Sequence, residues 1–246
     1  MNIGVNILAL LRKFLLLFIL SIPSNSWGAI AKVASVYADS NDTFTTGSID
    51  TTGATLITAG VGFELTIPAL TDSKGNTWAE NKSVASGGNA NCKMFSSFNP
   101  VVGSGHTFTL TGITMLAGIG AIAWSGAGDF SDATGASQGF NTTVQPGSLT
   151  PSADNMVLVS VSEGNPGGST SADAPFNTND GVFNKDDFQG TTGAQSFEIQ
   201  TTATARNPTW TYGSNATLTA ILASYSPAAA AAAGPQQRIR ARPLFR

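Results

Sequence analysis

A single histidine limits the nucleophilic chemistry that this sequence could support. Any Ser-His-Asp mechanism has to use His106, and Ser104 is the nearest hydroxyl that could act as nucleophile. The surrounding Gly-Ser-Gly lacks the Gly-x-Ser-x-Gly pattern of a nucleophile elbow. We therefore expect His106 to be a loop residue that opens the strand starting at Thr107, and we predict no catalytic residues.

Paired carboxylates offer a second chemistry, because two acids across a cleft are enough for glycoside hydrolysis. Glu64 and Glu198 each follow a phenylalanine inside a segment of strand-like composition. Strict alternation places each glutamate on the face opposite that phenylalanine. We interpret both as ordinary acids on a solvated outer face, and a glycan-processing enzyme is our third hypothesis.

Metal ligands are few. The acidic clusters 39–42 and 180–187 could supply oxygen ligands for Ca²⁺, but neither has the spacing of a calcium-binding loop. Cys92 is the single cysteine, so the chain contains no internal disulfide, and only His106 could join it as a soft ligand. We predict no metal and no cofactor, and we expect Cys92 to be a small buried residue, with an intermolecular bridge as the alternative.

Aromatic side chains could bind sugars by stacking, as planar ligands do elsewhere. Trp78, Trp210 and Tyr212 are the candidates for such a ligand-binding site. Trp210 and Tyr212 stand two residues apart and therefore share one face of a strand. That face could equally belong to the core, and the sequence leaves both interpretations open.

The segments that would position these residues are short, two-periodic and separated by turn residues, which is typical of an antiparallel all-β fold. No window between Ala31 and Pro227 keeps a helical period. Asp72-Ser73-Lys74-Gly75 predicts a type I turn with Gly75 at positive φ, closing a hairpin between the flanking strands. The predicted strands are 32–37, 55–63, 64–67, 77–84, 92–98, 107–111, 115–124, 155–161, 195–201, 209–212 and 217–225, with loops over 125–152 and 164–187.

Two stretches one hundred residues apart share a loose pattern. Ser48–Val61 and Ser148–Val161 each have a lead-in rich in small residues, then an apolar pair, and end in valine. We interpret them as equivalent strands of a pseudo-symmetric sandwich, although chance similarity between apolar strands would give the same pattern.

Composition and charge restrict the partners. Only 11% of residues are charged, which suits strands with neutral polar outer faces. Between Ile30 and Pro227 the chain carries six basic and fifteen acidic residues, a net charge of −9. Such a body repels phosphate backbones, so we exclude nucleic-acid binding by the domain itself.

The two ends of the sequence differ from this body. Residues 1–31 have the basic pair, the nine-residue apolar run and the small residues of a signal peptide, with cleavage expected after Gly28 or after Ala31. After a β-sandwich domain over residues 32–227, residues 228–246 form an alanine linker and an arginine-rich tail that we expect to be disordered. The tail could contact phosphate, anionic lipid or an acidic neighbour. We expect no stable membrane span after processing.

Several motifs together resemble β-sandwich modules of bacterial exported proteins and phage virion proteins. These motifs cover most of residues 32–227 and are 52–57, 72–78, 98–100, 105–110, 123–126 and 223–227. The resemblance implies two antiparallel sheets in a jelly-roll-like arrangement. It also implies adhesion, glycan contact or a role at a particle surface, and it carries over no catalytic residue.

We therefore predict an exported, all-β, two-sheet antiparallel sandwich of jelly-roll type without enzymatic activity. Its expected role is a structural or adhesion module in the extracellular space or at a cell surface, with glycans or surface proteins as partners. Exposed strand edges could also pair copies of the chain into a homo-oligomer. A carbohydrate-binding module is the alternative.

Overall fold

The computed structural model describes residues 29–65, 68–87, 89–113, 115–165, 170–176, 182–183 and 192–229. The signal-peptide interpretation (apart from residues 29–31), the arginine-rich tail and much of the predicted loop 164–187 lie outside these residues. The described residues form β-strands and no helix, so they contain no helix that could cross a membrane. The strands are β1 (Ala31–Ser40), β2 (Phe44–Thr45), β3 (Leu56–Phe63), β4 (Ala69–Asp72), β5 (Ala79–Ala85), β6 (Asn91–Phe98), β7 (Phe108–Thr111), β8 (Ala117–Ser125), β9 (Ala127–Val144), β10 (Val157–Asn165), β11 (Thr170–Ala172), β12 (Val182–Phe183), β13 (Thr192–Ile199) and β14 (Trp210–Pro227).

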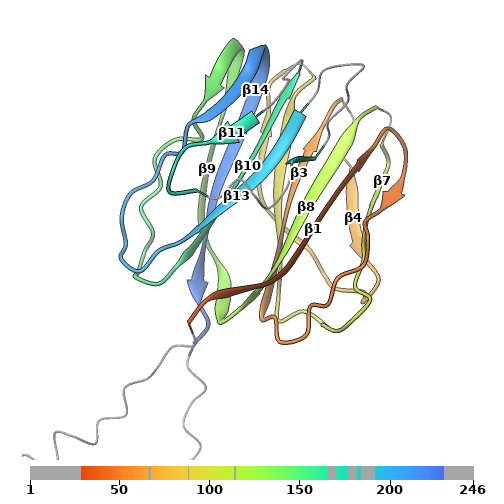
Figure 1. Cartoon of the computed structure of the whole chain (residues 1–246), viewed down its shortest axis with the longest axis vertical. Coiled ribbons are helices and arrows are strands. Elements are labelled where there is room, and N and C mark those ends of the chain that lie inside the picture. The colour runs from red at the N-terminus through yellow and green to blue at the C-terminus, as the bar shows by residue number, and fades with distance from the viewer. Residues whose placement is uncertain are drawn as a thin grey trace, which may run out of the picture. The chain divides into compact units, whose positions relative to one another are not determined.

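Two main antiparallel sheets face each other (Figure 1). The first sheet has the order β1-β8-β3-β6-β5. The second sheet has the order β9-β14-β10-β13-β12, with β11 beside the start of β14. A smaller sheet, β2-β7-β4, covers the outer face of the first sheet, and we refer to it as the cover sheet. The all-β sandwich predicted from the sequence is confirmed.

The first sheet is buried on both faces, which explains its apolar strands. Leu56, Met94 and Trp124 point toward Val159 and Tyr225 of the second sheet in one core. Alternate residues of the same strands pack under the cover sheet in a second core, formed by Ile57, Ala59, Val61, Phe63, Ile119, Phe108 and Leu110 among others. A strand that is buried on both faces has no polar side, so β3 and β8 are almost continuously apolar.

The two halves of the chain repeat one another. Leu56 of β3 pairs with Phe98 and Trp124, while Val157 of β10 pairs with Ile199 and Tyr225. Each residue of the second set follows its counterpart by 101 positions. The same offset holds along the whole of both ladders, so β10, β13 and β14 repeat β3, β6 and β8 in register.

The repeat extends to the outer layers. Ala69 pairs with Thr111 in the cover sheet, and Thr170 pairs with Tyr212 at the same offset of 101. Each half thus has strands equivalent to 1-8-3-6-5 in one layer and 2-7-4 in the other, a jelly-roll-like order in which the fifth strand pairs with the sixth. In the second half, β9 combines the equivalents of β1 and β2, and β14 those of β7 and β8. The predicted equivalence of 48–61 and 148–161 is a part of this repeat.

Four predictions about local structure are wrong. The turn at Asp72 forms, with Gly75 at a φ of 74°, but β4 pairs with β7 and β5 pairs with β6, so the turn connects two sheets and closes no hairpin. Residues 127–144, expected to be loop, form the long strand β9 because they pair along β14. Residues 209–212 and 217–225 belong mostly to one continuous strand, β14, and Glu64 lies in a bend after β3.

The first strand, β1, and the last strand, β14, both lie beside the segment around Gly126 that connects the two halves. Ala31 pairs with Ser125, and Pro227 pairs with Ala127. Between these two pairs, the N–H of Ala228 donates to the carbonyl of Gly126 at 2.8 Å. The first strand, the last strand and the connection between the two halves therefore lie together at one end of the sandwich.

Candidate functional site

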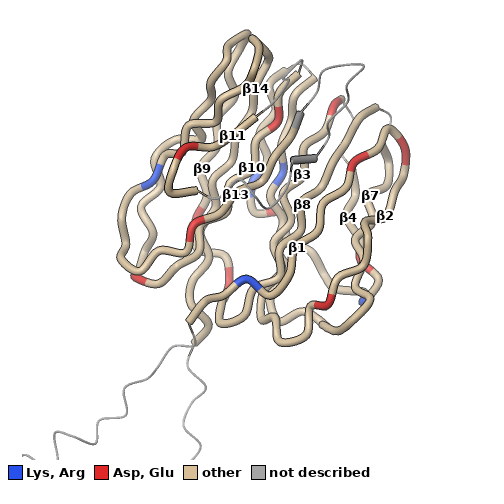
Figure 2. Tube along the Cα trace, viewed as in Figure 1, with Lys and Arg blue, Asp and Glu red and all other residues tan. Residues whose placement is uncertain are grey.

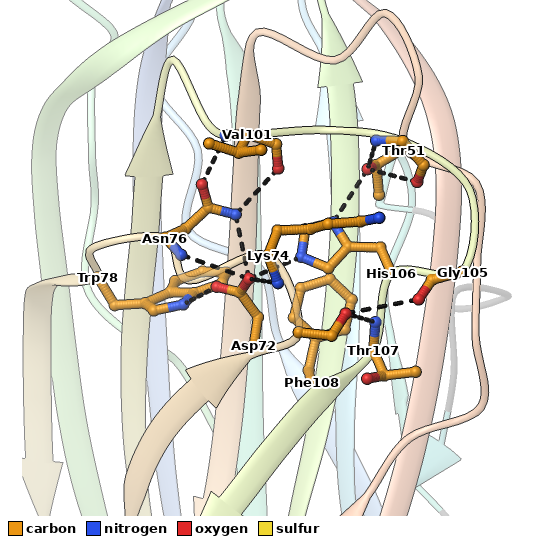
Figure 3. A network of polar contacts seen from close by, with 12 residues as sticks. Thr51, Asp72, Lys74, Asn76, Trp78, Val101, Gly105, His106, Thr107 and Phe108 are labelled. Atoms are coloured by element: carbon orange, nitrogen blue, oxygen red, sulfur yellow. Dashed lines mark hydrogen bonds and ion pairs between the residues drawn. The ribbon is translucent and has the colours of Figure 1, made fainter.

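The carboxylate of Asp72 is the centre of a hydrogen-bond network at one edge of the cover sheet (Figure 3). Asp72 ends β4 and accepts hydrogen bonds from the backbone N–H of Lys74 at 2.8 Å and from Trp78 Nε1 at 2.8 Å. The amide of Asn76 donates to the same carboxylate at 3.2 Å and to the carbonyl of Val101 at 3.1 Å. The turn is thus held from within by its own first residue.

His106 extends this network to a third chain segment. Its Nε2 lies 3.0 Å from Asp72 Oδ1, and its Nδ1 lies 3.0 Å from Thr51 Oγ1. The imidazole stacks on Phe108, with ring centroids 4.7 Å apart. Backbone hydrogen bonds between His106 and Ile49 hold this part of the chain in place. Figure 3 shows the carboxylate, the imidazole and the hydroxyl in one line.

This line has the order of groups found in hydrolase triads, with threonine in the place of the nucleophile. The side chains of Asp72 and His106 have no exposed area, and Thr51 is completely buried. Thr51 Oγ1 also accepts from the N–H of Gly103 at 3.1 Å. The hydroxyl of Thr51 is therefore closed to solvent, and the network holds three segments of the chain together.

The sequence did not reveal this network. It predicted His106 as a loop residue beside Ser104, but Ser104 is exposed, and its carbonyl accepts from Lys74 Nζ at 2.9 Å. Asp72 and His106 come together only because β4 pairs with β7 and places Asp72 opposite Phe108. The only sequence signal was an aspartate at a turn and a lone histidine.

Glu64 is not an outer-face acid, contrary to our expectation. Its exposed fraction is 1%, and it accepts a hydrogen bond from the side-chain amide of Asn165 in the second half. The physical reason is the cover sheet. Phe63 points into the core under the cover sheet, so the opposite face, which carries Glu64, is the interior between the two main sheets.

Further polar groups lie at this end of the interior. Cys92 Sγ is 3.1 Å from Thr219 Oγ1, and Glu163 is fully buried near both. Burial, and then the negative charge of Glu163, hold the pKa of the Cys92 thiol well above its usual range. A thiol that stays protonated and inaccessible is a poor nucleophile, so Cys92 has the structural character expected from the sequence.

Glu198 lies on the other side of the second sheet from this interior. The guanidinium of Arg206 donates two hydrogen bonds of 2.6 Å to the carboxylate of Glu198. These hydrogen bonds raise the pKa of Arg206. A sheet therefore separates Glu198 from Glu64, and the two carboxylates do not flank one cleft. The interpretation of Glu198 as an outer-face acid agrees with its position, although its ion pair leaves it only slightly exposed.

The three aromatic candidates are placed differently from one another. Trp78 is half-buried and donates to Asp72. Trp210 is completely buried and donates to Ser160 Oγ at 2.9 Å, and Tyr212 is 3% exposed, with its hydroxyl 2.6 Å from Ser162 Oγ. Trp210 and Tyr212 thus share a face, as predicted, and that face packs in a core. A shallow groove of about 230 Å³ beside this core is lined by Thr170, Ser171, Thr211, Tyr212 and Gly213.

No group of three or more metal-binding side chains occurs within the described ranges. The fold places the protein in the class of all-β sandwiches, here assembled from two jelly-roll-like halves. No protein-family model matches the sequence, and comparison with curated proteins and with solved structures finds no match.

Proposed function

We propose that this protein is an exported, non-enzymatic structural or adhesion module that acts at a cell or particle surface and associates with further copies of itself. The observation that carries the proposal is the burial of Thr51, His106 and Asp72. Side chains with the order of a hydrolytic triad here hold three chain segments together, and this structural use supports a non-enzymatic role.

The surface is consistent with this role. Charged residues are sparse and scattered over the described domain (Figure 2), and most exposed positions are neutral. A body of low charge density does not concentrate charged ligands. It offers hydroxyl and amide groups and strand edges instead, which suit contact with other proteins.

The full mature chain should be tested for association and for hydrolysis in parallel. Sedimentation velocity and electron micrographs over rising concentration should show concentration-dependent multimers, and a panel of ester, peptide and glycoside substrates should remain uncleaved. Hydrolysis by the wild type that disappears in His106→Gln would overturn the non-enzymatic part. A chain that stays monomeric at high concentration would overturn self-association.

Carbohydrate binding is the second candidate, and one observation favours it. The groove beside β11 and the start of β14 is lined by Tyr212 and by the hydroxyl-bearing residues Thr170, Ser171 and Thr211, and a lining that combines an aromatic residue with polar residues suits sugars. Since Tyr212 is only 3% exposed, little of its ring is available for stacking. Binding to a glycan array that is lost in Thr211→Val would establish this function, and a blank array would remove it.

A further inference from the structure

The outer edges of the two main sheets are protected unequally. An open strand edge invites pairing with another chain, and native edges are usually blunted by charge, by bulges or by shortness. β1 carries Lys32 and a register shift between Lys32 and Ala34. β5 carries Glu80 and Lys82, with a register shift between them, and β12 is two residues long.

β9 lacks these protections over most of its length. It pairs with β14 along one side, and from Ala133 to Val144 it contains no charged residue and no proline. Residues 137–140 are all exposed, so both faces of this part of the strand are open to solvent. Phe140 is 74% exposed, an unusually large apolar surface for an isolated strand edge.

The backbone donors at the two ends of β9 are occupied by its own side chains. Asp129 and Asp132 accept hydrogen bonds from the N–H groups that follow them, at 2.7 and 2.8 Å, and Asn141 accepts from the N–H of Thr142 at 2.7 Å. Between these caps, Asp132–Gln138 pairs with Leu218–Ser224 without a register shift. The regular, uncapped part of the edge is therefore the stretch around Gly135.

We propose that β9 pairs antiparallel with β9 of a second copy, about a two-fold axis at Gly135, so that the second sheets of two molecules become one continuous sheet. Such isologous pairing is self-complementary by symmetry. The inference rests on the self-association proposed above and names its surface.

Charge favours this register and orientation. With Gly135 opposite its own copy, Asp132 lies across from the neutral Gln138 of the second copy. A parallel in-register pairing would instead bring Asp132 beside Asp132, which destabilises a sheet.

The net charge of the domain makes the proposed association depend on ionic strength. Two bodies of −9 repel each other at a distance, and this repulsion is screened by salt. Contact through a neutral edge should therefore strengthen as ionic strength rises, whereas contact of acidic surfaces with the arginine-rich tail should weaken.

The test compares the full mature chain with two lysine variants in sedimentation equilibrium. Ser137→Lys places a charge in the exposed centre of the edge, and Thr202→Lys adds the same charge at an exposed position in the loop between β13 and β14, outside the edge. We expect dimers of the wild type and of Thr202→Lys, and a dissociation constant about tenfold or more higher for Ser137→Lys. Circular dichroism establishes that both variants keep their strands.

Hydrogen exchange gives a second, independent readout. On raising the concentration of the wild type, amides in the peptide covering 131–143 should gain protection, while those of β1 and β5 should not. If the wild type associates but Ser137→Lys associates equally well, or if protection appears at β1, the edge assignment is wrong and the proposed function stands. A wild type that remains monomeric would overturn both the β9 pairing and the self-association in the proposed function.

Discussion

Glu64 and Asn165 occupy the same position in the two halves, 101 residues apart, and the amide of Asn165 donates to the carboxylate of Glu64. Gly60 and Val161 are likewise equivalent, and a Cβ added at Gly60 would lie 2.9 Å from Val161 Cβ. Equivalent residues that meet must lie near a two-fold axis, so a pseudo-symmetry axis runs between β3 and β10. The interior of this protein is constructed like the interface of a symmetric dimer.

Gly60→Ala should be strongly destabilising. The new methyl would lie 2.4 Å from Gln195 Oε1 and 2.9 Å from Val161 Cβ, and overpacking of this kind typically costs about 1–3 kcal/mol. Urea denaturation would measure the change in the free energy of unfolding. Gly139→Ala is the control, because nothing lies within 4 Å of its added Cβ.

A double-mutant cycle separates overpacking from a general effect of alanine. Val161→Gly removes the stiff neighbour, so Gly60→Ala should cost less in that background than in the wild type. Equal costs in both backgrounds would contradict close approach along the pseudo-symmetry axis.

Asp72→Ala should lower the stability of the domain more than any other single substitution in the turn. It leaves the ring N–H donor of Trp78 and the buried imidazole of His106 without their partner, and each buried polar group left unsatisfied costs about 1–3 kcal/mol. Thermal or urea denaturation measures the loss. Ser104→Ala, at an exposed neighbour, should change stability by less than about 0.5 kcal/mol, and equal effects of the two variants would refute the role of the network.

Stability should fall in alkaline solution. Burial raises the pKa of Tyr225 and of Tyr212 above the value near 10 of an exposed tyrosine, and for Tyr212 the charge of Glu163 adds to the effect. Below about pH 10 both states keep these hydroxyls protonated. Above it only the unfolded chain ionises, so each tyrosine lowers stability by up to about 1.4 kcal/mol per pH unit.

This pH dependence is measured by urea denaturation at several pH values together with tyrosinate absorbance. Two of the three tyrosines should ionise only as the chain unfolds. Tyr225→Phe should make the loss of stability with pH less steep, although it also gives up the hydrogen bond to Asn81. Ionisation of all three with an unchanged strand signal would contradict the burial of these side chains.

Cys92 should not react with iodoacetamide in the folded protein at neutral pH. Its thiol is buried and its pKa is raised, first by burial and then by Glu163, so the reactive thiolate does not form. Mass spectrometry should find alkylation only after denaturation. The double variant Cys92→Ala/Ser104→Cys carries an exposed thiol and should react at once. One equivalent of label on the folded wild type would refute the prediction.

The mature chain should begin at Ala29. Ile30 packs in the core between the main sheets with 7% of its surface exposed, and Ala31 already pairs with Ser125. Cleavage after Ala31 would remove both contacts, whereas cleavage after Gly28 keeps them. Intact-mass measurement of chain exported from a bacterial host decides between the sites, and a mature mass that begins at Lys32 would contradict this prediction.

Much of the main-sheet framework could be predicted from the sequence, because buried strands carry a strong signal. β3 and β8 are almost continuously apolar, β10 begins with the apolar run Val157–Val159, and each of the three coincides with a predicted strand within a few residues. The turn at Gly75 could also be predicted, since its chemistry is local.

What could not be predicted depends on which strands pair. β9 has small polar residues without clear alternation, and its strand conformation follows from pairing with β14. Asp72 and His106 meet because β4 pairs with β7, although the turn suggested pairing with β5. Glu64 is buried because the cover sheet packs over Phe63, and no local sequence pattern predicts that this sheet is there.

The meeting of Ala31, Gly126 and Pro227 at one end of the sandwich has a consequence for chain connectivity. A circular permutant could join Ala229 to Ala29 and open the chain at Gly126, which would exchange the order of the two halves. Every strand pair would survive this rearrangement, because no ladder crosses from one half to the other. The pairing of the strands therefore does not depend on which half comes first in the sequence.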